Sequence, residues 1–188
     1  MLTTWELGAV INIIIKNYVG LMRLFLALNF NNSFKEAVSH IYLKLKKSGV
    51  KGNYTLLPNL HMTLAFLGET IKVDEIKVKK VIESVNFTPF ELTFNKLDSF
   101  VNCGKEIVYL ATKNDTLITL VSQLRSKLKN FDISFDEKNF RAHITLLRNA
   151  VGFSSELISI NKLTASVESI DLMHSHRVDG VLTYTRIY

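Results

Sequence analysis

Cysteine, proline and glycine are scarce in this sequence, which has one, two and eight of them among 188 residues. The single cysteine, Cys103, excludes an internal disulfide framework and fits a reducing compartment, so we expect the protein in the cytoplasm. With so little proline and glycine, no Pro/Gly-rich linker or low-complexity tract divides the chain. The length suits one domain or two small lobes.

The signature motifs of several enzyme classes are also missing. The sequence has neither a P-loop nor a GxGxxG fingerprint, so it implies neither ATP nor NAD, and it has no GxSxG motif of a serine hydrolase. The histidines His40, His174 and His176 have no HExxH pattern or cysteine cluster around them. Because zinc sites need three or four ligands, we expect no catalytic metal.

No hydrophobic run has the length of a membrane span. The apolar stretch Leu7–Ile15 is interrupted by Asn12 and ends at Lys16, well short of the ~20 residues that a span needs. No basic segment precedes it, as a secretory signal would require, so we expect no membrane association. Because a strand pattern begins at Met22, we predict that Met22 is the natural start and residues 1–21 are an upstream extension. An additional helix packed on the body is the alternative.

Acidic residues are outnumbered by basic ones, 17 to 23, which gives a formal net charge of +6 and a pI of about 9.4. Two interpretations of this charge stay open. The protein is either an ordinary basic protein or one that binds a polyanion such as RNA. Hydrophobic residues make up 47% of the chain, which is enough for a substantial core.

A four-residue pattern occurs twice, as HMTL starting at His61 and as HITL starting at His143. Each copy lies in a short apolar segment that predicts a strand, where alternate side chains point to one face. Each histidine therefore shares a face with the threonine two residues later, Thr63 or Thr145. Burying these polar groups twice would cost free energy unless they were paired or opened to a cleft. Two such strands facing each other would bring together two proton-transfer groups and two hydroxyl donors, a set suited to a phosphate ester.

The two motifs occupy equivalent places in a repeat. A strand, a helix and a motif strand follow one another over residues 23–67 and again over 107–148. This order predicts two related lobes, with the motif strands facing each other across a pseudo-twofold axis. The other predicted elements are a helix over 73–85 and strands near 90–97, 166–172 and 181–187.

Local patterns predict the helix ends and faces. Ser33 with Glu36 forms a capping-box pattern at the start of the first helix, and Gly49 is placed to end it. Asn114 or Asp115 is placed to begin the helix in the second repeat. In the helix over 73–85, the residues predicted to face inward are Val73, Ile76, Val81, Ile82 and Val85.

Two residues that follow the motifs are placed by strand alternation. Phe66 shares the apolar face of the first motif strand and is predicted to lie in the core. Arg148 falls on the face opposite His143 unless the strand ends or bulges before it. Arg148 either reaches a phosphate from the strand end or pairs with a carboxylate. Arg141, just before the motif, is a candidate contact for the backbone of a polyanion such as RNA.

The motifs and their flanks resemble the two-histidine (2H) phosphoesterase superfamily, and in particular its bacterial RNA 2′,3′-cyclic phosphodiesterase (2′-5′ RNA ligase) family. The resemblance runs from Met22 nearly to the C-terminus. The segments that carry it are MRLFLALNF (22–30), NLHMTLAFLGET (59–70), FELTFNKLDSF (90–100), FRAHITLLR (140–148) and a Ser175…Gly180…Tyr184 ending. One departure is Ala142, where the family usually has a proline that would stiffen the entry to the strand.

The resemblance implies an α+β fold in which residues 22–188 form a single bilobal domain. Two antiparallel sheets would flank a central cleft, with helices on the outside. It further implies that His61 and His143 are catalytic, that Thr63 and Thr145 bind the substrate phosphate, and that no metal or cofactor takes part. The implied partner is RNA or an oligonucleotide with a 2′,3′-cyclic phosphate end, and we expect the enzyme to be a monomer.

The chemistry of this set suggests hydrolysis with one histidine as base and the other as acid. We assign His143 as base and His61 as acid, which would release a 2′-phosphate. Swapped roles would give a 3′-phosphate, and the pseudo-symmetry leaves both open. Weak reverse 2′-5′ ligation is a further expectation. Two alternatives remain: a module that binds RNA ends without turnover, or a phosphodiesterase for 2′-5′ oligonucleotides or small cyclic nucleotides.

Overall fold

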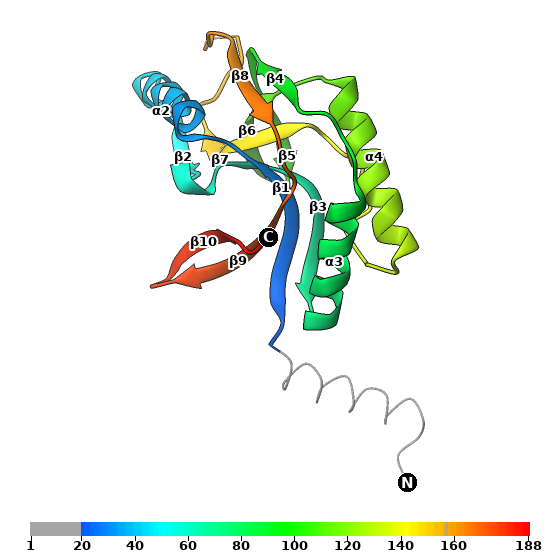
Figure 1. The fold of residues 1–188 in the computed structure, drawn as a ribbon. Coiled ribbons are helices and arrows are strands. Elements are labelled where there is room, and N and C mark those ends of the chain that lie inside the picture. Colours follow the sequence, from blue (N-terminus) through cyan, green and yellow to red (C-terminus); the bar gives the residue numbers. More distant parts are fainter. Residues whose placement is uncertain (1–19, 157) are drawn as a thin grey trace.

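A computed structural model describes residues 20–156 and 158–188 of the chain (Figure 1). The predicted extension over residues 1–21 therefore lies almost wholly outside the described residues. No helix in the described ranges is long and apolar enough to cross a membrane. The elements in chain order are β1 (Met22–Asn29), α2 (Asn32–Lys47), β2 (Lys51–Tyr54), the 3-10 helix η1 (Leu57–Asn59), β3 (His61–Thr70), α3 (Lys72–Ser84), β4 (Phe90–Phe94), β5 (Lys96–Asn102), β6 (Lys105–Ala111), α4 (Asp115–Asn130), β7 (His143–Val151), β8 (Leu163–Val167), β9 (Asp171–Val178) and β10 (Val181–Arg186).

Two four-stranded antiparallel sheets, with strand orders β10-β9-β1-β3 and β2-β7-β6-β5, form the body of the molecule. The predicted repeat is present, because β1 pairs with β3 in one sheet and β6 pairs with β7 in the other. The α+β class and the two antiparallel sheets are therefore confirmed. The sequence did not predict the separate two-stranded ribbon of β4 and β8. The prediction that residues 22–188 form one domain stays a prediction.

The helices cover the outer faces of these sheets, with α2 and α4 on opposite sides of the molecule in Figure 1. Each presents an apolar stripe with the spacing of a buried helix face, and the stripe of α4 is as predicted. It consists of Leu117, Leu120, Val121, Leu124 and Leu128, all buried. The main cluster of buried residues draws on both sheets. A second, small cluster of Phe25, Ala27 and Met173 contacts Phe66 and Tyr184. Because Phe25 and Ala27 pair with Phe66 and Thr63 of β3, this cluster lies on the face that carries the first motif.

The ends of the first helix are partly as predicted. Gly49 follows the last turn of α2 with φ +79°, a conformation that glycine adopts at little cost. The N-cap, however, is Asn31, whose side chain accepts a hydrogen bond from Phe34 N at 2.9 Å, so the capping box at Ser33 was wrong. In the second repeat Asn114 is the N-cap, as expected.

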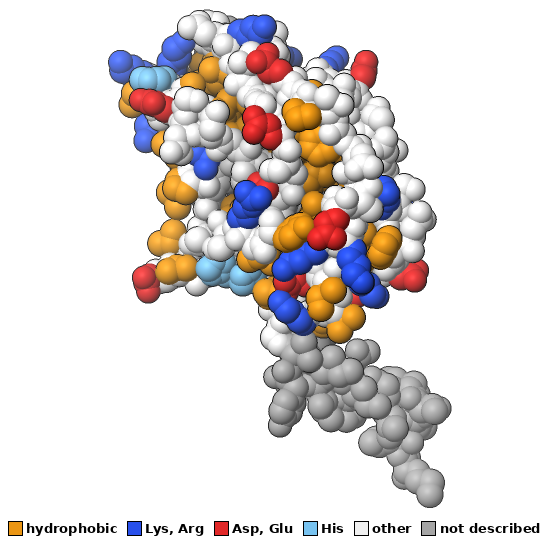
Figure 2. All heavy atoms as spheres, viewed as in Figure 1, with side chains coloured by type: hydrophobic (Ala, Val, Ile, Leu, Met, Phe, Trp, Pro, Cys, Tyr) orange, Lys and Arg blue, Asp and Glu red, His pale blue; other side chains and the backbone are white. Residues whose placement is uncertain are grey.

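Two other predictions were wrong in detail. In α3 the side chains of Val73 and Ile76 are exposed, and the buried face consists of Glu75, Val78 and Val81. Hydrophobic side chains lie among Lys and Arg side chains on this part of the surface (Figure 2). The strand expected over 166–172 is the end of β8 and the start of β9, separated by a break at residues 168–170.

Candidate active site

The two motifs lie at the starts of β3 and β7, and each histidine ring is fixed in the same way. His61 Nδ1–H donates to the carbonyl of Asn59 at 2.8 Å, and His143 Nδ1–H donates to the carbonyl of Arg141 at 2.7 Å. Because a carbonyl oxygen only accepts, these bonds place the proton of each neutral ring on Nδ1. Each Nε2, on the other side of the ring, is then available to exchange a proton with a substrate.

Within the first motif the histidine and the threonine share a face, as predicted. Thr63 Oγ1 lies 3.0 Å from His61 Nε2, so its hydroxyl donates to the unprotonated nitrogen. In the second motif the register pairs His143 with Ala111 and Thr145 with Tyr109, which places both on one face of β7.

Two aromatic rings pack around each histidine. His61 contacts Phe25 and Tyr184, with ring centroids 4.8 and 5.0 Å apart. His143 contacts Tyr109 and Phe100 at 5.5 and 5.8 Å. Phe25 and Tyr109 lie on β1 and β6, the equivalent strands of the two repeats. The pseudo-symmetry predicted for the strands thus extends to the surroundings of the histidines.

Burial lowers the pKa of both histidines. The pKa of His61 is lowered to about 4, mainly by desolvation and also by the charges of Arg148 and His143, while the bond to the Asn59 carbonyl acts in the opposite direction. Desolvation, followed by the charges of Arg141 and Arg148, also lowers the pKa of His143. Both rings are therefore neutral at pH 7 before an anion binds.

The strands bulge directly after the motifs, which corrects the sequence-based placement of two residues. In β3, Thr63 pairs with Ala27 and Ala65 with Leu26, which leaves Leu64 without a partner in the β1–β3 register. A bulge adds one residue and reverses the alternation beyond it. Phe66 therefore lies on the motif face, where it is half-buried and packs against Arg23 at 4.8 Å, and its predicted place in the core was wrong.

The same bulge recurs in β7. Thr145 pairs with Tyr109 and Leu147 with Val108, so Leu146 is the unpaired residue. Beyond it Arg148 is exposed and shares the face of His143 and Thr145. This is the placement expected from the sequence if the strand bulges before Arg148.

Two pockets flank the motifs, and each takes one histidine and one threonine from different motifs. The larger pocket, of about 450 Å³, is lined by Thr63 and His143. The smaller, of about 270 Å³, is lined by His61, Thr145 and Arg148. Each pocket therefore brings together side chains of both motifs.

The other polar candidates lie around or outside these pockets. Arg141 lines the larger pocket, with its guanidinium 5.1 Å from the centre of the Phe100 ring. His174 and His176 stack on each other along β9, with ring centroids 4.6 Å apart, and histidine side chains are visible beside β9 and β10 in Figure 2. Within residues 20–156 and 158–188 no three His, Cys, Asp or Glu side chains are grouped as metal ligands.

Sequence reasoning missed several residues of the site. Phe100 and Tyr184 were quoted only as parts of resembling segments, and Asn59 was not singled out. Asn59 is buried, and its side-chain amide donates to Leu182 O at 2.8 Å and accepts from Tyr184 N at 3.2 Å. It thereby holds β10, and with it the Tyr184 ring, beside His61. The sequence signal that could have indicated this is an asparagine two residues before the motif histidine.

Comparison with known proteins agrees with this geometry. A model of the 2′-5′ RNA ligase superfamily matches residues 33–179, which include both motifs. The RNA 2′,3′-cyclic phosphodiesterase of Archaeoglobus fulgidus is 35% identical over 130 residues, covering 68% of this chain and 72% of that protein. The protein of the same name from Thermotoga maritima is 34% identical over 134 residues, covering 68% and 70%. The chain belongs to the 2′-5′ RNA ligase superfamily. The resemblance to 2H phosphoesterases is thus confirmed.

Solved structures of this superfamily have the same fold. The crystal structure of E. coli LigT complexed with 3′-AMP matches with a TM-score of 0.73 at 26% identity. The match covers 89% of this chain and 95% of that one. The two antiparallel sheets with their helices therefore form the same fold as E. coli LigT.

Proposed function

We propose that this chain hydrolyses RNA ends that carry a 2′,3′-cyclic phosphate, without a metal or another cofactor, and releases a 2′-phosphate. The observation that carries the proposal is the crossed arrangement of the motifs, because each pocket is lined by the histidine of one motif and the threonine of the other, which supports a reaction that uses both histidines. The names of the relatives and the 3′-AMP bound to E. coli LigT support the choice of substrate class.

The reaction needs one proton to leave water and one to reach the leaving oxygen. His143 Nε2 takes a proton from water as the water oxygen forms a bond to phosphorus. The bond between phosphorus and O3′ breaks, and His61 Nε2, protonated in the complex, gives its proton to O3′. The product has a 2′-phosphate and a free 3′-hydroxyl. The reverse roles would break the bond to O2′ and leave a 3′-phosphate.

The non-bridging oxygens of the phosphate gain negative charge in the transition state. The hydroxyls of Thr63 and Thr145, one on each side of the phosphate, would donate hydrogen bonds to them. Arg148 lines the same pocket as His61 and Thr145 and would add a positive charge there. Arg141, at the rim of the larger pocket, is our candidate for contact with the RNA backbone.

The larger pocket is suited to the nucleoside that carries the cyclic phosphate. Three phenylalanines line it, Phe66, Phe100 and Phe140, and aromatic faces of this kind stack on nucleobases. Stacking tolerates any base, so we expect weak preference among terminal nucleotides.

The same machinery supports a weak reverse reaction. A 5′-hydroxyl in place of water would attack the cyclic phosphate and give a 2′-5′ linkage without ATP, because the strained ring supplies the leaving group. Water is far more abundant than RNA ends, so hydrolysis would dominate. The cytoplasmic location and the monomeric state stay predictions.

The test is hydrolysis of a short RNA with a 2′,3′-cyclic phosphate end, in EDTA, with 2′- and 3′-phosphate products resolved. The variants are His61→Ala and His143→Ala, and the matched control is His176→Ala, a histidine on β9 outside both pockets. We expect turnover by the wild type and the control and at least a hundredfold loss in each motif variant. RNA binding without turnover by the wild type would favour the binding module, and a 3′-phosphate product would reverse the two roles.

A further inference from the structure

One edge of the first motif strand is covered by the second repeat. β3 is the outer strand of its sheet, and beyond it the described residues place no further strand. The carbonyls of Leu64 and Phe66 nevertheless have donors, Arg125 Nε at 3.2 Å and Asp136 N at 2.8 Å. Arg125 lies on α4, and Asp136 lies on the segment 131–142 that joins α4 to β7. A backbone carbonyl at a sheet edge needs such a partner when water is excluded.

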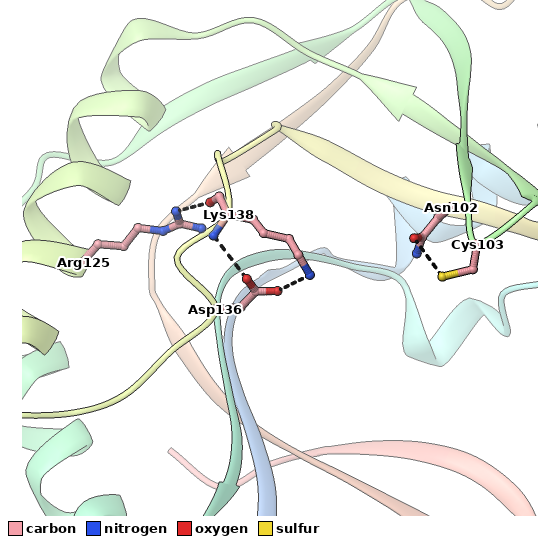
Figure 3. Close-up of polar contacts among 5 residues, drawn as sticks. All are labelled: Asn102, Cys103, Arg125, Asp136 and Lys138. Carbon is pink, nitrogen blue, oxygen red and sulfur yellow. Dashed lines mark hydrogen bonds and ion pairs between the residues drawn. The ribbon is translucent and has the colours of Figure 1, made fainter.

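The guanidinium of Arg125 also holds the segment that leads to the second motif. Its Nη1 donates to the carbonyl of Lys138 at 2.8 Å, as Figure 3 shows. Lys138 and Arg141 belong to the same segment, and the Arg141 carbonyl accepts the bond that orients His143. One side chain is therefore bonded both to the residue after Thr63 and to the segment before His143.

Arg125 lines the larger pocket, but two of its donors are bonded to backbone carbonyls, which favours a bridging role. The two bonds use nitrogens on different sides of the planar guanidinium, which a lysine could not reproduce with a fixed geometry. The guanidinium lies 5.6 and 5.8 Å from the ring centres of Phe135 and Phe140, so it is held among aromatic side chains. The nearby carboxylate of Asp136 is bonded to Lys138 N and Nζ at 3.2 and 3.0 Å (Figure 3).

We propose that Arg125 is a positioning residue that sets the spacing between the two His–Thr pairs by tying the Leu64 carbonyl to segment 131–142. The inference rests on the proposed function, because only a reaction that uses both histidines at once depends on that spacing. Without the guanidinium the segment would keep the Asp136 N–Phe66 O bond to β3 but lose the tie at Leu64, beside the motif, and the phosphate would meet one histidine out of place. Misplacement by about 1 Å costs a reaction of this kind ~100-fold in rate.

The test compares Arg125→Lys and Arg125→Gln with the matched control Lys129→Gln. Lys129 lies on the same helix and pairs with Glu137 of the same segment at 2.6 Å, but both side chains are exposed. With the cyclic-phosphate RNA we expect Arg125→Gln to lower kcat by about 10- to 100-fold and to change KM less than about twofold. The kcat of Arg125→Lys should lie between those of the wild type and Arg125→Gln. The control should stay within twofold of the wild type in both kcat and KM. Rates are measured well below the thermal midpoint of each variant.

A second measurement does not depend on turnover. Loosening the segment before β7 admits water to His143, so in Arg125→Gln the pKa of His143 should rise toward its ordinary value in an NMR titration. In Lys129→Gln it should stay where it is in the wild type. An unchanged His143 titration in both Arg125 variants, or a loss confined to KM, would overturn the proposal. A wild type without hydrolysis but with the Arg125-specific change at His143 would overturn the proposed function and leave the positioning role supported.

Discussion

Binding of an oxyanion between the motifs should protonate His61, and the size of the effect follows from its environment. Burial and the charges of Arg148 and His143 hold the pKa of His61 at about 4 in the unliganded protein. The acid of the proposed reaction, however, must carry a proton near pH 7. Binding of the substrate therefore has to raise the pKa of His61.

The magnitude can be worked out from the charges. An oxyanion hydrogen-bonded to His61 Nε2 brings opposite charges to about 4 Å, where they attract by roughly 4 kcal/mol at an effective dielectric constant of about 20. One pKa unit corresponds to 1.36 kcal/mol, so the shift is about 3 units. The pKa of His61 should rise from about 4 to about 7 in the complex. The histidine would then be charged at neutral pH only when the phosphate is in place.

The assay is an NMR titration of the histidine rings with and without saturating sulfate, which keeps its charge over the relevant range. His61→Gln assigns the signal. By linkage, sulfate affinity should rise up to about tenfold per pH unit as the pH falls from about 7 toward 4. In kinetics, the optimum of kcat/KM, which reports the unliganded enzyme, should lie at lower pH than the optimum of kcat. The reasoning is refuted if His61 titrates near 6.5 without sulfate, or if saturating sulfate leaves its pKa unmoved.

Three further outcomes are expected. The free energy of unfolding should rise as the pH goes from about 4 to about 6.5, by at most about 3 kcal/mol, because the unfolded chain protonates His61 first. Denaturant melts should show a smaller rise for His61→Gln. Gly52→Ala should destabilise by about 1–3 kcal/mol and lower activity, since φ is +145° and a Cβ would meet the carbonyls of Arg148 and Asn149 at 2.8 Å. Asn31→Ala removes the N-cap of α2 and should cost about 1 kcal/mol in thermal unfolding without affecting kcat.

Strong periodicity made some elements predictable, and buried polar groups concealed others. The stripe of α4 is apolar throughout, so its face could be read from spacing. In α3 the buried face includes Glu75, whose carboxylate pairs with Lys72 at 2.7 Å and Lys79 at 3.0 Å. Because a charged residue occupies the centre of the buried face, the pattern of apolar residues predicted the wrong face, with Val73 and Ile76 inside. Both side chains are exposed to solvent. Glu75 is buried with its charge paired within the helix, by lysines at i,i+3 and i,i+4 spacing.

The histidines and threonines could be placed from the sequence because alternation holds from each histidine to its threonine. It fails one residue later, at Leu64 and Leu146, where leucine fits a bulge and a regular strand equally well. Both strands bulge at the same position of the motif, so in each repeat the residue five positions after the histidine lies on the same face as the histidine. That residue is Phe66 in one repeat and Arg148 in the other. At the proposed site a phosphate between the two histidines would meet an aromatic ring on one side and a positive charge on the other, which would give a pseudo-symmetric site a direction.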